Sequence, residues 1–449
     1  MGFRLMFLLL PLALSNPLAF ALSARPADTH SDGNAQVIQH VVILVQENRS
    51  TDNMFHDPTL IANGANIASY GLNSKGQHIK LEPISITAGY DPDHSHHSFE
   101  LMYDGGKMDG ADRIPINGHH YPPNPQFKYI QASDVAPYFQ LAEQYGFADH
   151  MFQTHEGTSF PGHQFLFAGT SAPTATSDLF ASEDMVGFPH ANWDMGCEGS
   201  PKASVRLIDP AGHESRKMFP CFEHAALSDL IDDAGLSWRY YVTSLNSIWT
   251  APNAIKHIRE GADWANVILP QTQILTDIAN GQLANVSWVT PSGQASDHPW
   301  MNTGLGPSWV ASIVNAIGTS QYWNSTAIFI TWDDWGGWYD HVRPPQVLVD
   351  CKQWGCGYVY GFRVPLVIVS PYAKQTYISH KDHDYGSILK FTEEVFGLPS
   401  LGYADAYADD LSDCFNFNQA PRGFRTIATP YDANYFLTDK TPPTDPDTD

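Results

Sequence analysis

Residues 327–334 read AIFITWDD, an uninterrupted run of apolar and β-branched side chains that ends in two adjacent aspartates. Three other short runs have the same character: His40–Gln46 (HVVILVQ), Val286–Pro291 (VSWVTP) and Val364–Pro371 (VPLVIVSP). None of them alternates between apolar and polar residues, which is typical of strands that are buried on both faces of a parallel sheet. The four runs therefore predict a central sheet that is covered by helices on both sides.

Helical patterns occur between these runs. Phe222–Gly235 and Gly386–Gly397 carry apolar residues at helical spacing and end in glycine, and Ser308–Gly318 also begins with a good N-cap residue. Strands that alternate with helices over roughly 400 residues predict an α/β fold with a mostly parallel sheet. Two long irregular stretches, near residues 100–135 and 172–215, are expected to be loop insertions that form lids or the walls of a crevice.

The composition is that of a globular protein with a strongly acidic surface. The chain is 43% hydrophobic and 16% charged, and its formal net charge is −24 from 48 acidic and 24 basic residues. Such a charge disfavours nucleic acid as a partner and disfavours simple attraction to anionic membranes. A neutral lipid or a small phosphate ester remains possible as a substrate.

The first residues predict export. The segment MGFRLMFLLLPLALSNPLAFALSA has one basic residue, an apolar run and an Ala19-Phe20-Ala21 sequence that fits the small-x-small cleavage pattern. We expect a signal peptide at 1–21 and a secreted or periplasmic protein. No later stretch has ~18 uninterrupted apolar residues, so no stable transmembrane anchor is expected. The rest divides into a flexible segment at 22–36, one large domain at 37–435 and a Pro- and Asp-rich disordered tail at 436–449.

Five cysteines are available for disulfides in an exported protein. The favoured pairs are Cys197–Cys221 and Cys351–Cys356, which leaves Cys414 over. The spacings do not match a zinc site.

Polar side chains follow the ends of the predicted strands. Glu47 and Asn48 follow the first run, Asp333 and Asp334 follow AIFITW, and His298 lies in the loop after Val286–Pro291. In open α/β sheets, ligands bind at the carboxyl ends of the strands. Oxygen ligands suit a hard divalent cation, which would relieve the repulsion between the adjacent aspartates. The plain alternative is a strand-to-turn junction at the aspartates and a helix start at Asn48.

A hydroxyl group marks the start of another helix. In QTHEGTSFPGHQFLFAG (Gln153–Gly169), a polar loop leads through Ser159 into an apolar segment, and Pro161 suits a first helical turn. The plain interpretation of Ser159 is an N-cap. The functional interpretation is a nucleophile, because a helix N-terminus favours both an alkoxide and an incoming phosphate.

Histidines are numerous, with 20 in the chain. His94, in YDPDHSHHSFE, His163 and His298 lie near the polar segments above. A loop histidine is more commonly inert than catalytic. As a group they could donate hydrogen bonds to phosphate oxygens and protonate a leaving alcohol.

Several of these stretches together resemble the bacterial phospholipase C / acid phosphatase phosphoesterase family. HVVILVQENRSTDNMF, TWDDWGGWYDHVRPP, GFRVPLVIVSPYA, residues 380–399 and YDPDHSHHSFELMYDGGKMDG resemble its motifs, and the similarity extends from about residue 38 to 400. The resemblance implies an alkaline-phosphatase-like α/β fold and one divalent metal ion. The residues that it implies as metal ligands are Glu47, Asn48, Asp333 and Asp334. It also implies Ser159 as a nucleophile that forms a phospho-enzyme, and His94 and His298 as phosphate-contacting residues.

The nucleophile motif departs from the family pattern. Many phospholipase members have T-x-P-N-R where this chain has Ser159-Phe160-Pro161-Gly162-His163. Serine keeps the hydroxyl, as in the acid phosphatase branch, but Gly162 lacks the amide that would bind phosphate. His163 or a backbone amide is the predicted replacement for that contact, and the predicted substrate-binding residues are Asn48 and His163. Thr158 is the alternative nucleophile.

The predicted function is a metal-dependent phosphoric ester hydrolase, with a phosphate monoester or a phospholipid as substrate. Oxygen ligands favour Ca, Mg or Mn, and nearby histidines leave Zn or Fe open. The three tryptophans Trp332, Trp335 and Trp338 could form an apolar rim for lipid or belong to the core. The alternatives are a sulfatase- or phosphonate-hydrolase-like enzyme of the same superfamily, and a non-catalytic protein that metal stabilises. The oligomeric state stays open.

Overall fold

The apolar runs form neighbouring strands near the middle of one eight-stranded sheet. The computed structural model describes residues 1–2, 37–185, 195–346 and 360–444. The strand order across the sheet is β14 (Val267–Ile268), β13 (Trp238–Tyr241), β15 (Val286–Val289), β1 (His40–Gln46), β16 (Thr326–Trp332), β17 (Leu366–Val369), β8 (Gly146–Ala148) and β18 (Tyr377–Ser379). The predicted α/β fold is confirmed.

Most of the strand pairs are parallel, as predicted. β1 runs parallel to both β15 and β16, and β13 runs parallel to β14 and β15. β17 differs, because it is antiparallel to β16 and to β8. A strand that is buried on both faces is apolar whichever way it runs, so the sequence pattern could not reveal this reversal.

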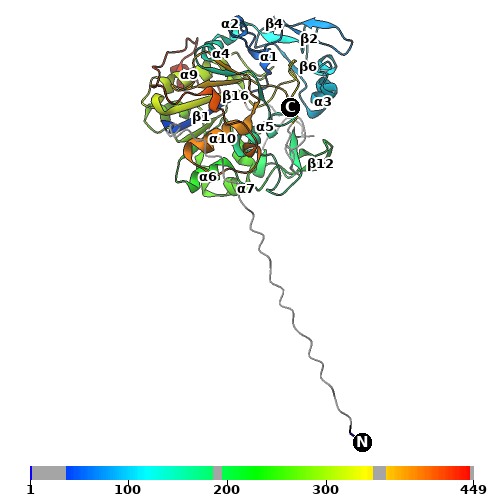
Figure 1. Cartoon of the computed structure of the whole chain (residues 1–449), viewed down its shortest axis with the longest axis vertical. Coiled ribbons are helices and arrows are strands. Elements are labelled where there is room, and N and C mark those ends of the chain that lie inside the picture. Colours follow the sequence, from blue (N-terminus) through cyan, green and yellow to red (C-terminus); the bar gives the residue numbers. More distant parts are fainter. Residues whose placement is uncertain (3–36, 186–194, 347–359, 445–449) are drawn as a thin grey trace.

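Helices cover both faces of the sheet (Figure 1). One layer contains α4 (Ala132–Gln144), α8 (Gln273–Ala279), α9 (Gly306–Gly318) and α11 (Ala433–Thr438), and the other contains α5 (Ser159–Ala168), α6 (Leu227–Asp233) and α10 (Tyr385–Phe396). The three predicted helices correspond to α6, α9 and α10. α10 ends as predicted at Gly397, which has left-handed backbone angles, while its N-cap Asp384 accepts the Ser387 N–H. α6 begins later than predicted, because Phe222 pairs with Ile255 in a β-bridge.

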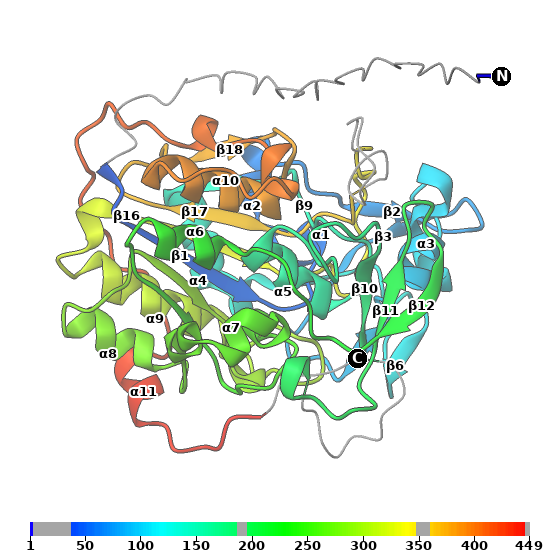
Figure 2. The same ribbon diagram turned by 90° about the horizontal axis from the view of Figure 1, so that it is seen from below.

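The two irregular stretches contain small elements. The stretch near 172–215 forms an antiparallel sheet of β10 (Phe180–Met185), β11 (Val205–Ile208) and β12 (Glu214–Met218). The stretch near 100–135 contains the end of α3 (His96–Tyr103), β6 (Ile116–Gly118) and β7 (Lys128–Ile130), and the chain before it forms β2 (Tyr70–Leu72), β3 (His78–Lys80), β4 (Glu82–Ile84) and β5 (Tyr90–Pro92). Figure 2 shows β2, β3, α3 and β10–β12 together at one end of the molecule.

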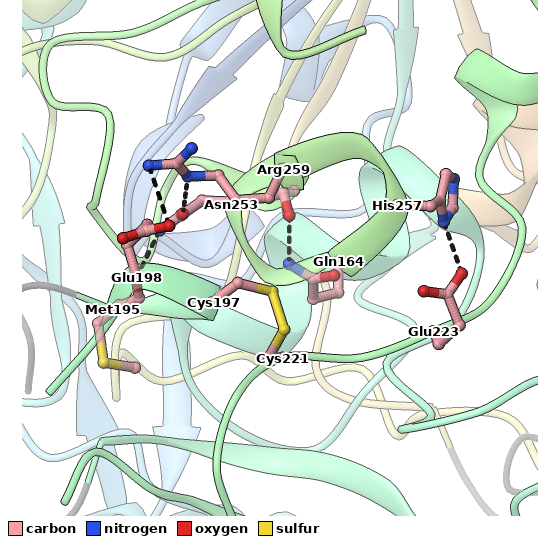
Figure 3. The surroundings of a disulfide bond; sticks show 10 residues. Gln164, Met195, Cys197, Glu198, Cys221, Glu223, Asn253, His257 and Arg259 are labelled. Atoms are coloured by element: carbon pink, nitrogen blue, oxygen red, sulfur yellow. Dashed lines mark hydrogen bonds and ion pairs between the residues drawn. A yellow bond between two sulfur atoms is a disulfide. The ribbon is translucent and has the colours of Figure 1, made fainter. Parts of the chain in front are cut away.

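One predicted disulfide is present. Cys197 and Cys221 are bonded to each other and lie beside Gln164 of α5 (Figure 3), whereas Cys414 is a buried free thiol. The predicted pair Cys351–Cys356 lies outside the described residues, as do most of the predicted signal peptide 1–21 and the segment 22–36. Within the described ranges, no helix has the length and apolar character needed to cross a bilayer.

The predicted start of the tail at residue 436 is wrong. Residue 436 lies inside α11, and its phenyl ring packs edge-on against Trp309 with ring centroids 5.2 Å apart. Beyond the helix, Gln294 bonds to the carbonyl of Pro442 and to the amide of Thr444. The short apolar stretch before the polar tail is therefore enough to attach this part of the chain to α9 and its neighbours.

Candidate active site

The acidic residues at the ends of β1 and β16 meet, because the two strands are parallel neighbours with Gln46 opposite Trp332. The Asn48 N–H donates to Asp333 Oδ1 (3.0 Å), and the Asp333 N–H donates to the carbonyl of Gln46 (3.0 Å). Glu47, Asn48, Asp333 and Asp334 are all fully buried. The structure therefore brings together the four predicted metal ligands.

Two unusual backbone conformations make this approach possible. Asn48 has φ +58°, a left-handed conformation that asparagine tolerates better than most residues. Gly336, with φ +62°, faces it so closely that a Cβ atom there would lie 2.0 Å from the Asn48 carbonyl oxygen. The glycine after the aspartate pair is needed both for its conformation and for its lack of a side chain.

His163 joins the carboxylates from helix α5. Its Nε2 lies 3.2 Å from Glu47 Oε1 and 3.6 Å from Asp333 Oδ2, and ligand atoms of the three residues lie within 4.8 Å of one another. The sequence predicts His163 as a substrate-binding residue, but it lies among the predicted metal ligands. Glu47 Oε2, Asp333 Oδ2 and Asn48 Oδ1 are buried acceptors without a hydrogen-bond donor among the described residues. The orphaned carboxylate oxygens of Glu47 and Asp333 and a nitrogen of His163 thus lie together, and such a set of ligand atoms suits a divalent cation.

The electrostatics favour a cation as well. Burial, reinforced by Asp333 and Asp334, raises the pKa of Glu47 well above its ordinary value. Burial and the Asp333 carboxylate raise the pKa of Asp334 to about 7. Burial also lowers the pKa of His163 to about 4, so its imidazole is neutral and can offer a lone pair at neutral pH. Ionised carboxylates at this density are unfavourable unless a positive charge lies between them.

Ser159 lies next to this cluster, and Thr158 points elsewhere. Ser159 is the first residue of α5, and its Oγ donates to Asp334 Oδ2 (3.2 Å). Thr158 occupies the N-cap position but makes no side-chain capping bond; its Oγ1 accepts the N–H of Asp184 on β10 (2.8 Å). The N-cap interpretation of Ser159 is therefore wrong, and of the two hydroxyls Ser159 is the one that contacts the aspartate pair.

The two predicted phosphate-contacting histidines lie on the Asn48 side. His94 Nδ1 lies 3.1 Å from the Pro92 carbonyl, so Nδ1 carries the hydrogen and Nε2 can accept from the Asn48 amide (2.8 Å). His94 Nε2 is 3.9 Å from Asp334 Oδ2. The His298 ring lies 6.2 Å from that of His94, centroid to centroid. His94 thus reaches the cluster from a loop outside the sheet, and His298 lies next to the His94 ring.

Gly162 has a steric role that the sequence comparison did not suggest. A Cβ atom there would lie 2.4 Å from the Asp333 carbonyl oxygen and 2.9 Å from His155 Nε2. His155 itself contacts the same carbonyl (3.1 Å), and the Tyr385 hydroxyl donates to it as well. Gly162 therefore allows α5 to pack directly on the end of β16.

Two residues near the site were missed. Asp184 accepts the Phe160 N–H (2.6 Å) at the start of α5, and burial raises its pKa to about 8. It lies in a stretch predicted to be irregular, where no periodic pattern marked it. His155 lies in the segment that contains Ser159, and its proximity in sequence was the only available signal.

Asp340 and His341 support the site from a distance. Asp340 forms a bidentate ion pair with the buried Arg363 (2.8 and 3.0 Å), and His341 bonds to Asp52 (2.7 Å). The Arg363 guanidinium also contacts Asp52 (3.1 Å), so an arginine supplies the positive charge beside both aspartates. The cluster ties the loop after β16 to α1 (Thr51–Met54).

The three tryptophans near the aspartate pair, at positions 332, 335 and 338, are fully buried. The core interpretation is confirmed for all three, and they supply no exposed rim for a lipid.

Sequence and structure comparisons show what the chain is similar to. The sequence model described as "Phosphoesterase family" matches residues 38–399. Phospholipase C A of Mycobacterium tuberculosis (strain ATCC 25618 / H37Rv) is 25% identical, over 88% of this chain and 80% of that protein. Hemolytic phospholipase C of Pseudomonas aeruginosa is 23% identical, over 86% of this chain but only 57% of its own length. Among solved structures, a protein of the alkaline phosphatase superfamily from Vibrio parahaemolyticus matches 84% of this chain and 70% of its own, with 11% identity and a TM-score of 0.37.

Proposed function

The chain belongs to the phosphoesterase family, and on that premise we propose that it is a metal-dependent phosphoric ester hydrolase with Ser159 as its nucleophile. One observation carries the proposal. The Ser159 hydroxyl lies at the N-terminus of α5, 3.2 Å from Asp334 and beside a buried cluster of orphaned oxygen acceptors. A nucleophile, an anion-binding helix end and a cation site then coincide.

The residues that would hold the metal ion are Glu47, Asn48, Asp333 and Asp334, with His163 as a fifth candidate. When bound, a divalent cation supplies positive charge that lowers the pKa of the serine hydroxyl and stabilises charge on the phosphoryl oxygens. A donor set of oxygens with one imidazole nitrogen suits Mn, Zn or Fe as well as Mg or Ca.

The chain's own residues supply the remaining steps. Ser159 Oγ attacks phosphorus in line with the leaving alcohol, so that the Oγ–P bond forms as the P–O bond to the alcohol breaks. Water then cleaves the phosphoserine and regenerates the hydroxyl. His94 and His298 are the candidates for binding the phosphoryl oxygens and for protonating the leaving group. For His94 this requires that Nε2 takes up a proton and exchanges the Asn48 amide for the substrate oxygen. Asn48 holds His94 through its side-chain amide, which limits where that imidazole can lie.

For the substrate, we propose a phosphodiester of the phospholipid type first, because the relatives in two bacteria bear the name phospholipase C. A phosphate monoester is the second candidate, because this chain has serine where many phospholipase members have threonine. Rates of hydrolysis of p-nitrophenylphosphorylcholine and p-nitrophenyl phosphate by the same preparation distinguish the two.

The test of the mechanism is a pair of site variants, Ser159→Ala and Asp333→Asn. We expect Ser159→Ala to lower kcat by about 10⁴-fold or more while the purified protein keeps its metal. Asp333→Asn should lower both activity and metal content. Ser133→Ala, which removes an exposed serine on α4, is the matched control. Turnover that survives Ser159→Ala would disprove the proposed nucleophile.

We also propose that the chain is exported. The Cys197–Cys221 disulfide supports this, since such bonds persist in oxidising compartments. N-terminal sequencing of the protein recovered from periplasm or medium should begin near residue 22; a mature protein that begins at Met1 would contradict the predicted signal peptide.

A further inference from the structure

Strand β10 is irregular where it carries two adjacent carboxylates, Glu183 and Asp184. Between the pairs Ala181↔Leu207 and Met185↔Val205, β10 advances by four residues while β11 advances by two. The extra residues form a β-bulge. Bulges re-aim side chains and are frequent beside active sites.

Each carboxylate accepts a hydrogen bond from the first turn of a different helix. Glu183 accepts the N–H of His96, the first residue of α3, and Asp184 accepts the N–H of Phe160, the second residue of α5, both at 2.6 Å. Amides of a first turn have no partner within their own helix, and a carboxylate also interacts favourably with the helix dipole there. Both carboxylates are buried.

α5 carries Ser159, and α3 begins two residues after His94. Asp184 contacts the residues on both sides of Ser159, because its own N–H donates to Thr158 Oγ1 (2.8 Å) while its carboxylate accepts from Phe160. Glu183 holds the chain two residues after His94. The bulge therefore contacts both the first turn of the helix that carries Ser159 and the chain just after His94.

The bulge and the nucleophile loop are also in direct backbone contact. A Cβ atom at Gly157 would lie 1.7 Å from the Ser182 carbonyl oxygen, so the loop before Ser159 packs on β10 without any intervening side chain. Contact this close leaves little freedom for the nucleophile to shift relative to β10.

We propose that Glu183 and Asp184 are positioning residues that set Ser159 and His94 at their working separation. The β10–β12 sheet is then a part of the catalytic framework. The inference rests on the proposed role of Ser159. A misplacement of ~1 Å in a reacting group can lower the rate by about 10²-fold, which gives the expected size of the effect.

The experiment compares isosteric and truncating variants at each position. Asp184→Asn and Glu183→Gln keep an oxygen acceptor for the helix amide, whereas Asp184→Ala and Glu183→Ala remove it. We expect the alanine variants to lose kcat by about 10²-fold with KM changed less than about 3-fold, and the isosteric variants to stay within about 5-fold of the parent. Asp178→Asn removes an exposed carboxylate from the same insertion and is the control of equal charge change. If Asp184→Ala does not fold, Asp184→Ser makes the same comparison, since its hydroxyl is too short to reach the Phe160 amide.

Amide hydrogen exchange supplies a readout that does not depend on turnover. Loss of the Asp184 carboxylate should speed exchange in the peptide covering residues 158–168, and loss of the Glu183 carboxylate should speed it in the peptide covering 95–103. A merely stabilising role would raise exchange across the whole domain.

The outcomes separate this inference from the proposed function. If alanine at both positions leaves kcat within about 3-fold, or if Asp184→Asn is as inactive as Asp184→Ala, the positioning role is disproved; the second result would instead indicate proton transfer. If Ser159→Ala retains activity, the proposed function fails. If Ser159→Ala is inactive while both alanine variants turn over normally, only the positioning inference fails.

Discussion

The buried carboxylates make the pH dependence of stability a test of the cation site. The perturbation is removal of bound metal by a chelator, followed by desalting, and the quantity is the free energy of unfolding with and without metal. In the metal-free protein, burial and the neighbouring aspartates hold the pKa of Glu47 well above its ordinary value and that of Asp334 at about 7. Both carboxyls are ionised at neutral pH in the unfolded chain.

The sign follows from proton linkage. A carboxyl with a raised folded-state pKa binds more protons in the folded state, so unfolding free energy falls as pH rises from the unfolded to the folded pKa. His163 acts in the opposite direction, because its pKa is lowered to about 4. Above pH 6.5 its imidazole is unprotonated with or without metal, so its contribution cancels in the difference between the two forms. The informative window is therefore pH 6.5 to 8.

The magnitude can be worked out for Asp334. With a folded pKa of about 7, its carboxyl lowers the stability of the metal-free protein by about 0.8 kcal/mol between pH 6.5 and 8. Glu47, whose pKa is also raised, changes the stability in the same direction. With metal bound, both groups are ionised in the folded state and this dependence disappears.

The assay is urea unfolding of metal-loaded and metal-free protein at pH 6.5 and 8. Groups far from the site titrate alike in both forms, so the difference between the two stabilities isolates the site. We expect that difference to widen by about 0.8 kcal/mol or more from pH 6.5 to 8, and to widen less in Glu47→Gln, which cannot titrate there. A difference that is the same at both pH values, or no effect of the chelator at all, would refute the cation site at these carboxylates.

Three further predictions concern the framework. Gly162→Ala places a Cβ atom 2.4 Å from the Asp333 carbonyl, so α5 must shift, and kcat should fall by about 10²-fold in the steady-state assay; full activity would contradict the packing argument. Arg363→Met removes the cation beside the buried Asp340 and leaves Asp52 with His341 alone, so it should lower the urea-derived stability by about 3–5 kcal/mol, whereas an unchanged midpoint would mean that the ion pair contributes nothing net. Cys197→Ser combined with Cys221→Ser removes a link across 24 positions and should lower stability by about 3 kcal/mol, a loss that vanishes when parent and variant are compared under reducing conditions.

The sheet and the acidic cluster could be predicted because their signals are local. A run such as AIFITW is apolar at every position, and the acids follow it immediately, so one short stretch gives both the strand and the site at its end. Pairing of β1 with β16 then brings Glu47 to Asp333 without further information. The place of His163 could also have been inferred, since it follows Ser159 by four residues and lies on the same helical face. The reversed direction of β17 could not, because burial on both faces removes the pattern that depends on direction.

The bulge at Glu183 and Asp184 could not be predicted, because the amides that it binds lie 87 and 24 positions away in sequence. The sequence does indicate close packing around the nucleophile, through the glycines on either side of it. Gly157 and Gly162 flank the nucleophile, and each faces a carbonyl oxygen at a distance that excludes any side chain. Compared with the family pattern, Gly162 lacks a side-chain amide that could donate to phosphate. In this fold, however, it is the residue that lets α5 pack on the end of β16. In this chain a Cβ atom at position 162 would lie 2.4 Å from the Asp333 carbonyl oxygen, so the close packing of α5 on β16 requires glycine there.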